Sequence, residues 1–366
     1  MKYRKYLRGN EFISEIGLGL GNIHVSSNQT IEETIQYAVE NGINYFDLCG
    51  GRIGVYEIFG NVVSQQNRKA IYTQMHFGAV YPNGRYAFSR NLEEIKLSFE
   101  TVLNLSQLKY TDFGFIHCID EEDDFNDVMN NGLFDYVCNL KEQGIVKHIG
   151  FSTHTPSIAS KFIETGKIDL FMFSINPAFD FNKGQYAYGS IDERQSLYQK
   201  AQSLGIGISV MKPFAGGQLL DEKRSPLKIK LSMYQCLQYA LDKPGVITCL
   251  PGVSCVDDVK KNILKFFDLS SEQKDYSIIH HLKNTSHLER CVYCNHCSPC
   301  PAGIDIGLVN KYYDLAINND ERASVHYLQL SKHAGDCLKC NHCNQRCPFH
   351  VKQQEKMEKI YQYFGI

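Results

Sequence analysis

Cysteine residues are concentrated near the carboxyl-terminal end of this sequence. The chain has 14 Cys in 366 residues, and eight of them lie between Cys291 and Cys347. The other six are scattered over the preceding part of the chain: Cys49, Cys118, Cys138, Cys236, Cys249 and Cys255. A disulfide scaffold needs an oxidising compartment, and the start MKYRKYLRGNEF lacks the apolar core of a secretory signal. Clustered thiols in such a chain are therefore expected to hold metal.

The spacing of the clustered cysteines indicates iron–sulfur chemistry. Cys291, Cys294, Cys297 and Cys300 form a C-x2-C-x2-C-x2-C-P run, and Cys337, Cys340, Cys343 and Cys347 form a C-x2-C-x2-C-x3-C-P run. The second run has the bacterial ferredoxin spacing, in which the fourth Cys ligates the other cluster. Zinc is the alternative, but it gives no reason for a Cys triplet and a Cys-Pro pair that occur twice. We therefore predict two 4Fe–4S clusters, one on Cys291, Cys294, Cys297 and Cys347, the other on Cys337, Cys340, Cys343 and Cys300.

The longer, Cys-poor part of the chain has the pattern of eight strand–helix units. Short apolar runs alternate with stretches that have apolar residues at three- and four-residue spacing. The runs are Ile16–Leu20, Ile43–Asp47, Ala70–Gln74, Phe113–His117, Lys147–Phe151, Leu170–Ser174, Ile206–Met211 and Val246–Leu250. Their number predicts a (β/α)8 barrel, in which polar residues that follow the strands line the mouth. An open doubly wound sheet is the alternative, but no GxGxxG opens the first helix.

The domain organisation follows from these two parts. We expect a barrel domain over residues 1–275, which begins with a hairpin at Gly9-Asn10, and a small ferredoxin-like domain over residues 276–366. Helical patterns at Ile306–Ala316 and Ala323–Leu330 separate the two Cys runs, so this second domain is expected to be α-helical.

Charge and hydropathy exclude several classes of function. The formal net charge is -2, which gives no electrostatic case for nucleic acid or an anionic membrane. No apolar run is long enough to span a bilayer. We expect a cytoplasmic protein with a small-molecule substrate, and its state as a monomer or homo-oligomer stays open.

Several motifs of the body resemble those of the aldo-keto reductases, in family order. They are Asn44–Asp47, Thr111–His117, Gly144–Ser152, Met211–Gly217 and Leu250–Ser254. With the Cys-rich tail, nearly the whole chain resembles the ferredoxin-tailed branch of that family. The resemblance implies a barrel that reduces a carbonyl at its mouth.

The resemblance also implies a tetrad of Asp, Tyr, Lys and His, which this sequence completes only in part. Asp47 and His117 match their positions. Arg52 occupies the Tyr position at the commonest spacing, and Tyr56 is the alternative if the loop is longer. The Lys position holds Gln74 or Met75, so the lysine is lost. The candidate catalytic residues are Asp47, Arg52, Tyr56, Gln74 and His117.

The pocket for a nicotinamide cofactor also matches the family only in part. The positions that match the family are Ser152, Asn176, Lys212, Pro213, Gly216, Gly217, Pro251, Gly252 and Ser254. Met172 replaces a family Gln, and Asp258 stands where many relatives carry an Arg for the 2′-phosphate. An acid there argues against a strong preference for NADPH. NAD(P) therefore stays open as a cofactor, and so does a flavin, for which there is no fingerprint.

Three functions fit these residues. The first is an anaerobic reductase whose clusters exchange electrons with a ferredoxin, flavodoxin or flavoprotein and with an organic substrate at the barrel mouth. The second is an ordinary NAD(P)H-dependent aldehyde or ketone reductase with structural clusters. The third is a non-enzymatic redox sensor or electron carrier. The first function is favoured, because the tetrad Tyr and Lys are lost while the cluster ligands are retained.

Overall fold

A closed ring of eight parallel strands forms the core of the protein. The computed structural model describes residues 1–184, 186–281, 291, 297–317, 321–347 and 351–366. The strands hydrogen-bond in the order β12-β11-β10-β9-β8-β5-β4-β3, and a parallel bridge between Ile16 and Cys249 joins the two edges. They are β3 (Leu18–Gly19), β4 (Tyr45–Leu48), β5 (Tyr72–Phe77), β8 (Thr111–Ile116), β9 (Val146–Thr153), β10 (Leu170–Ser174), β11 (Gly207–Met211) and β12 (Val246–Cys249). The predicted barrel is confirmed, and the open sheet is wrong.

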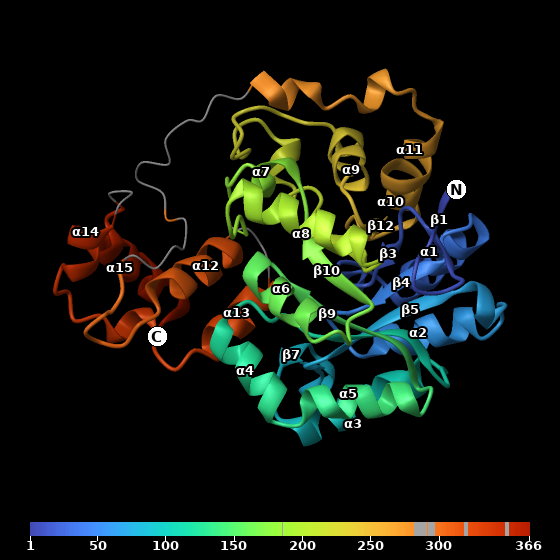
Figure 1. The fold of residues 1–366 in the computed structure, drawn as a ribbon, viewed down its shortest axis with the longest axis horizontal. Helices are drawn as coiled ribbons and strands as arrows, with labels where there is room; N and C mark the ends of the chain where they lie inside the picture. Colours follow the sequence, from blue (N-terminus) through green and yellow to red (C-terminus); the bar gives the residue numbers. More distant parts are fainter. Residues whose placement is uncertain (185, 282–290, 292–296, 318–320, 348–350) are drawn as a thin grey trace.

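Helices follow the strands and cover the outside of the ring (Figure 1). They are α1 (Asn28–Glu40), α2 (Gly54–Val63), α3 (Leu92–Leu105), α4 (Glu122–Asn130), α5 (Leu133–Glu142), α6 (Pro156–Glu164), α7 (Pro177–Asp180), α8 (Ile191–Ser203), α9 (Met233–Leu241), α10 (Val256–Asp258) and α11 (Lys265–Asp268). Local chemistry explains several starts, because Ser190 and Ser232 each form a capping box with the residue three positions on.

The amino-terminal hairpin closes the bottom of the barrel. Strands β1 (Tyr3–Lys5) and β2 (Phe12–Ser14) pair antiparallel. The buried Tyr6 and Ile13 pack inside the ring with Tyr45 and Phe113, and the Tyr6 hydroxyl donates to the carbonyl of Asp169 at 2.7 Å. This apolar plug leaves the opposite end, where the strands finish, as the mouth.

Two features near the mouth differ from the sequence interpretation. A short hairpin of β6 (Ala79–Val80) and β7 (Ala87–Phe88) follows β5, although two-residue strands leave no periodic signal. The acidic segment Glu121–Asp124, where the sequence predicts no helix, forms the start of α4. Its acidic side chains suit the first turn of a helix, where the helix dipole favours negative charge.

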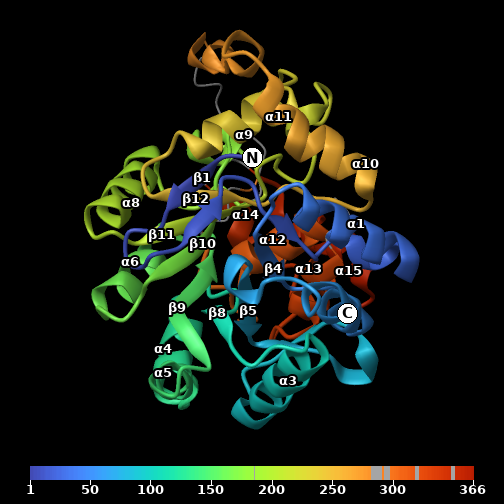
Figure 2. The same cartoon turned by 90° about the vertical axis from the view of Figure 1, so that its right-hand side faces the viewer.

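The Cys-rich tail is helical and lies against the mouth. Its helices are α12 (Ile306–Ala316), α13 (Glu321–Leu328), α14 (His342–Arg346) and α15 (Gln353–Phe364), and α12 has the predicted bounds. Helix α13 contacts β7, and in Figure 2 α12 and α13 lie behind the strands, within the outline of the ring. Upstream of the tail, Tyr276 still packs on Tyr239 of α9. Among the described residues, no helix is long and apolar enough to cross a membrane.

Candidate functional site

A continuous chain of hydrogen-bonding side chains lies at the mouth of the barrel. The Oδ1 atom of Asp47 lies 2.7 Å from Nε2 of His76. The Nδ1 atom of His76 lies 3.1 Å from Nδ1 of His117, and Nε2 of His117 lies 2.8 Å from the hydroxyl oxygen of Tyr86. The two histidines are each 7% exposed. Four titratable groups are thus joined from the barrel interior to the hairpin.

The barrel strands position the first three of these groups. Asp47 on β4 pairs in register with Gln74 on β5, and His76 points to the same face as Gln74 because side chains alternate along a strand. The register of β5 with β8 then brings His76 beside Phe115, two residues before His117. Parallel strands that end at one edge therefore bring Asp47, His76 and His117 together.

Backbone hydrogen bonds position Tyr86. The β6–β7 hairpin is tied to the loop after β4, because the backbone N–H of Tyr86 donates to the carbonyl of Gly51 at 3.0 Å. In the same way the N–H of Ile53 donates to the carbonyl of Gly84 at 2.8 Å. This pairing holds the Tyr86 hydroxyl over His117.

Gln74 lies below this chain in the barrel interior and is fully buried. Its Nε2 donates to Oδ1 of Asp47 at 3.1 Å, and its Oε1 accepts hydrogen bonds from the hydroxyls of Tyr45 and Ser209. Met172 lies next to it, with its sulfur 3.9 Å from Nε2 of Gln74. The amide therefore anchors the Asp47 carboxylate from beneath.

The two candidates for the Tyr position of the tetrad lie to either side of this chain. The Arg52 guanidinium donates to the carbonyl of His24 at 2.9 Å and to Oδ1 of Asn28 at 2.7 Å, so it ties the loops after β3 and β4 together. The Tyr56 hydroxyl is buried, bonded to the Tyr81 hydroxyl and to the backbone N–H of Gly50. Burial is the largest of several effects that raise the pKa of Tyr56 far above its usual value. Neither side chain has a hydrogen bond to Asp47 among the contacts of the described residues.

The predicted nicotinamide residues gather around the mouth, and several already have partners. Asn176 caps α7 through Oδ1 and donates from Nδ2 to the carbonyl of Lys212. Ser152 accepts from the N–H of Cys118 at 2.7 Å. Lys212 places its ammonium 4.1 Å from the centre of the Tyr186 ring. Pro213 and Pro251 are buried, whereas Gly216, Gly217 and Gly252 lie in partly exposed loops.

Asp258 has a specific partner in the last of these loops. Its carboxylate accepts from the N–H of Ser254 at 2.8 Å, while the carbonyl of Ser254 accepts from the Ser26 hydroxyl at 2.7 Å. The amide that begins this helical segment is therefore bonded to an acid of the chain itself.

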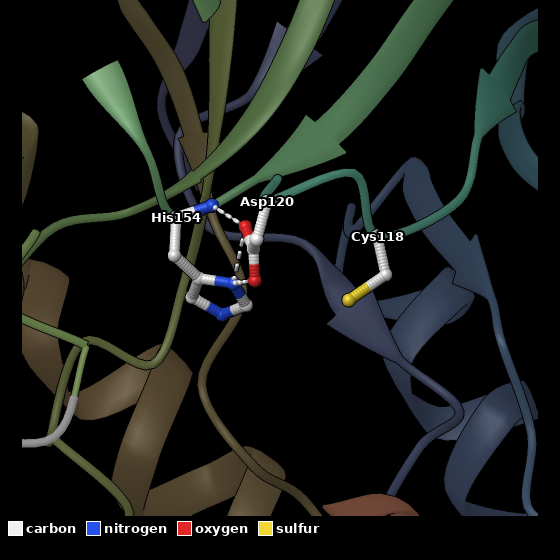
Figure 3. A group of neighbouring side chains, drawn as sticks. All are labelled: Cys118, Asp120 and His154. Carbon is white, nitrogen blue, oxygen red and sulfur yellow. Dashed lines mark hydrogen bonds and ion pairs between the residues drawn. The ribbon is translucent and has the colours of Figure 1, made fainter. Parts of the chain in front are cut away.

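A buried ionic network lies beside the mouth and joins the tail to the barrel. Asp120 accepts from the backbone N–H of His154 at 2.6 Å, lies 3.0 Å from its Nδ1, and accepts from Nζ of Lys311 at 2.7 Å. Figure 3 shows the Asp120 carboxylate directed at His154, with Cys118 on its other side. Lys311 comes from α12 of the tail, and its side chain is 1% exposed.

This network joins the tail to the barrel through a buried ion pair, Lys311 with Asp120. The donor atoms of Cys118, Asp120 and His154 lie within 4.8 Å of one another, but burial raises the pKa of Cys118 to about 12, so the thiol stays protonated. Burial alone would raise the pKa of Asp120, yet His154 and Lys311 outweigh it and hold that pKa well below its usual range. An ammonium group therefore already neutralises the carboxylate.

The same network predicts acid sensitivity. Burial outweighs the Asp120 carboxylate and lowers the pKa of His154 to about 4, against about 6.5 in an unfolded chain. Between these values the unfolded state binds a proton that the folded state does not, so the free energy of unfolding falls as pH falls. From pH 7 to pH 5 the loss should be roughly 2 kcal/mol. Urea unfolding of wild type and His154→Gln at both pH values measures this, and equal losses in the two proteins would contradict it.

The tail cysteines gather in two groups. One pocket is lined by the sulfur-bearing residues Cys300, Cys337, Cys340 and Cys343, and the N–H of Lys339 points at Sγ of Cys337 at 3.4 Å. In the other group Cys291 and Cys347 pack together with Val351. Burial first, and then Cys291, Cys343 and Cys347, raise the pKa of Cys297 to about 12, so these sulfurs are close enough to interact. Cys294 lies outside the described residues. Four soft donors around one pocket fit an iron–sulfur cluster.

Helix α12 joins the four-thiol pocket to the mouth. Ile304 and Ile306 line the pocket, and Lys311 and Tyr312 lie further along the helix. Tyr312 stacks on His326 of α13 at 5.6 Å between ring centroids, and His326 lies 4.8 Å from Phe88 of the hairpin. Phe88 in turn lies 6.3 Å from His117. A row of rings therefore runs from the tail to the candidate site.

Comparison with known proteins agrees with this architecture. The profile of the Aldo/keto reductase family matches residues 15–233, more than half of the chain. The chain belongs to the aldo/keto reductase family. A 4Fe-4S dicluster domain profile matches residues 290–352.

Individual relatives of this aldo/keto reductase are distant. An uncharacterized oxidoreductase of Bacillus subtilis, YqkF, is 22% identical over 285 residues, which cover 72% of this chain and 90% of that protein. The holo form of aldo-keto reductase AKR11C1 from Bacillus halodurans has 20% identity and a TM-score of 0.60, over 77% of this chain and 96% of that one. An aldo-keto reductase from Klebsiella pneumoniae in complex with NADPH has 13% identity and a TM-score of 0.52, over 74% and 92%. These structures show a shared barrel fold.

For this family member, the sequence identifies Asp47 and His117 as candidates but not the contacts that join them. His76, which is not among the candidates from sequence, contacts both Asp47 and His117. Its position two residues beyond Gln74 on the same strand face was the available signal. Tyr86, which is also absent from those candidates, ends the chain of contacts.

Proposed function

We propose that this protein is an iron–sulfur oxidoreductase that transfers electrons between two 4Fe–4S clusters and a carbonyl or related organic substrate at the barrel mouth. The observation that supports it best is the course of α12. Ile306 lines the four-thiol pocket, and Tyr312 joins the row of rings that ends at His117. Six residues of α-helix separate them, a rise of about 9 Å. An electron centre in the pocket would thus lie close to the candidate site.

The two groups of sulfurs support the ligand sets that the Cys spacing predicts. Cys337, Cys340, Cys343 and Cys300 would hold one cluster, and Cys291, Cys294, Cys297 and Cys347 the other. When bound, such clusters supply one electron at a time. A carbonyl needs two electrons and two protons to become an alcohol, so the chain itself must bind the substrate and deliver protons.

The mouth residues can meet these needs. Asp47 and His117, joined through His76, form a buried pathway for protons. Arg52 is half-buried beside His24, and its guanidinium is suited to hold an anionic or carbonyl oxygen of a substrate. The covering tail limits the entry of water, which favours proton transfer from the protein.

Electrons would enter at the outer side of the pocket. Cys340 is exposed and the neighbouring Leu338 is 65% exposed, so a one-electron carrier such as a ferredoxin, flavodoxin or flavoprotein can approach this wall closely. Because electron transfer is reversible, the same arrangement would also oxidise the substrate if the carrier were an acceptor.

A second function is NAD(P)H-dependent reduction, as the family membership and the NADPH complex of the Klebsiella pneumoniae protein suggest. The retained loop from Lys212 to Gly217 favours it. The Asp258 carboxylate accepts a hydrogen bond from the N–H of Ser254, and its negative charge would repel a 2′-phosphate bound beside it. NADH, which lacks that phosphate, would therefore fit better than NADPH.

One anaerobic experiment separates these functions. Protein reduced with dithionite should show 4Fe–4S signals by low-temperature electron spin resonance. After removal of dithionite, mixing with a panel of aldehydes and ketones should reoxidise the clusters with wild type, and more slowly with the double variant Asp47→Ala/His117→Ala. Clusters that stay reduced with every carbonyl, while NADH or NADPH quenches protein fluorescence and supports turnover, would establish the second function. Redox-active clusters with no substrate would leave a sensor or carrier.

A further inference from the structure

The side chains from Asp47 to Tyr86 form a directional path for a proton. Nε2 of His76 lies 2.7 Å from Oδ1 of Asp47 and 2.9 Å from the amide nitrogen of Gln74. A carboxylate only accepts hydrogen bonds, so we assign the N–H of His76 to Nε2 on the shorter contact, with Asp47, while the Gln74 amide also donates to that carboxylate. In neutral His76 the Nδ1 atom is then an acceptor, and it receives the Nδ1–H of His117. Nε2 of His117 in turn accepts from the Tyr86 hydroxyl. In this state every donor points inward, toward Asp47.

One additional proton reverses the direction of the chain. If His76 carries a proton on both nitrogens, its Nδ1–H donates to Nδ1 of His117, and the N–H of His117 moves to Nε2. That N–H then donates to the oxygen of Tyr86, whose own O–H is turned away from His117. The distances of 2.7, 3.1 and 2.8 Å allow hydrogen bonds of either direction.

We propose that the Tyr86 hydroxyl is the proton donor to the substrate oxygen, taking the role that neither Arg52 nor Tyr56 fills. The inference rests on the proposed function, because it assumes reduction of a carbonyl at this mouth. In the step, the O–H bond of Tyr86 breaks and an O–H bond forms on the substrate. Tyr86 regains a proton from Nε2 of His117, and His117 regains one at Nδ1 from His76. The pair of Asp47 and His76 ends one proton poorer and is refilled from water, and no electron moves in this step.

The geometry favours Tyr86 over the two positions expected from sequence. The Arg52 guanidinium donates hydrogen bonds to His24 and Asn28, and a guanidinium does not give up a proton in proteins. Tyr56 is fully buried with its hydroxyl bonded to Tyr81 and to backbone. Tyr86 is only partly buried, and it alone among the three has a hydrogen bond that leads back to Asp47.

The β6–β7 hairpin places Tyr86 close to both the proton path and the row of rings. Phe88, two residues further along, contacts His326 of the tail and the ring of His117. A substrate between Tyr86 and these rings would lie where the proton path and the row of rings meet. The substrate class is therefore a carbonyl compound whose oxygen can reach a phenol at the rim of the mouth, above the strand ends.

The first test is kinetic. Tyr86→Phe should lower kcat/KM for the best carbonyl by about 10²- to 10⁴-fold, the usual contribution of general acid catalysis, with iron content and cluster signals unchanged. Tyr81→Phe is the matched control, because it removes a hydroxyl at the start of the same hairpin, and it should change kcat/KM by less than about threefold. A Tyr86→Phe enzyme within threefold of wild type would overturn the proposal.

The second test needs no turnover. With ¹³Cζ-labelled tyrosine in the oxidised protein, the resonance absent from Tyr86→Phe belongs to Tyr86. It should shift in His76→Gln, although the path from His76 to Tyr86 runs through His117, and stay in place in His148→Gln, which replaces a partly buried histidine that packs on Tyr6 and Phe113. No shift in His76→Gln would overturn the relay. A shift in a protein that reduces no carbonyl would support the relay and reject the proposed function.

A third variant tests the proposal even if Tyr86→Phe fails to fold. Incorporation of 3,5-difluorotyrosine at position 86 keeps the ring and hydroxyl and lowers the phenol pKa. The alkaline limb of the kcat/KM profile, and the titration of the fluorine signal, should move to lower pH. An unmoved limb in an active, fluorinated enzyme would overturn Tyr86 as the donor.

Discussion

Replacement of Lys311 by Met should lower the free energy of unfolding by about 3–5 kcal/mol, because it leaves a buried carboxylate without its cation. The Lys311 and Asp120 side chains are 1% and 6% exposed, with 2.7 Å between Nζ and Oδ2. Asp120 would keep its hydrogen bonds from His154 but lose its charge partner. Anaerobic urea unfolding, followed by both far-UV circular dichroism and the visible absorbance of the clusters, measures the loss.

The control for this change is Lys261→Met. Lys261 pairs with Asp257 at 3.0 Å, but both side chains are more than 60% exposed, and solvent screens such a pair so that it contributes little to stability. Equal losses in the two variants would show that the buried pair does not stabilise the interface. A double-mutant cycle with Asp120→Asn then isolates the coupling between the two groups.

The loss should also have a functional consequence, because Lys311 and Tyr312 are neighbours on α12. If the ion pair holds α12 on the barrel, its removal should slow reoxidation of reduced clusters by a carbonyl more than it slows reoxidation by a small dye. The dye reaches the exposed side of the pocket near Cys340 and does not need the mouth. Equal slowing by both acceptors would indicate damage to the clusters instead.

The barrel could be predicted from the sequence because its signals are local. Each run such as Leu170–Ser174 is a continuous apolar segment between turn residues, as expected for a strand buried on both faces. Glycines such as Gly144 and Gly205 adopt the left-handed conformation where a helix ends before the next strand. The tail helix α12 was found with its bounds for the same reason, since its apolar spacing is regular.

The candidate site could be predicted only in part, because its contacts are not local. Asp120 and Lys311 are 191 residues apart, and no pattern around either one identifies the other. Tyr86 lies directly before β7, in a hairpin whose two-residue strands are too short for periodicity to reveal. The contact of His76 with Asp47 depends on the register of β4 against β5, and a shift of one residue would turn the side chain to the other face.

Arg52 shows why the alignment of one sequence position with a family motif does not place that residue in the site. A residue five positions after Asp47 was expected at the centre of the site, but the structure bonds its guanidinium to His24 and Asn28. The loop after β4 is instead paired with the β6–β7 hairpin through Gly51 and Tyr86. The hairpin thus brings a tyrosine to the mouth from a different loop, which alignment to a motif after β4 cannot detect.

Single substitutions of the tail cysteines should remove iron in two distinct sets. Protein isolated without oxygen should contain about eight iron atoms, as two 4Fe–4S clusters require. Cys300→Ser and Cys343→Ser should both lose the same cluster, although they belong to different Cys runs, because both line one pocket with Cys337 and Cys340. Each should retain about four iron atoms and the same remaining spin-resonance signal.

Cys291→Ser and Cys347→Ser should lose the other signal, since these two residues pack together. Cys138→Ser in the barrel, far from either Cys run in the sequence, should retain all the iron and serves as the control. If instead Cys300→Ser and Cys291→Ser shared one phenotype, each cluster would be held within a single run and the exchange of the fourth ligand would be wrong. Zinc in place of iron in the isolated protein would contradict the electron-transfer function, because zinc has no redox chemistry.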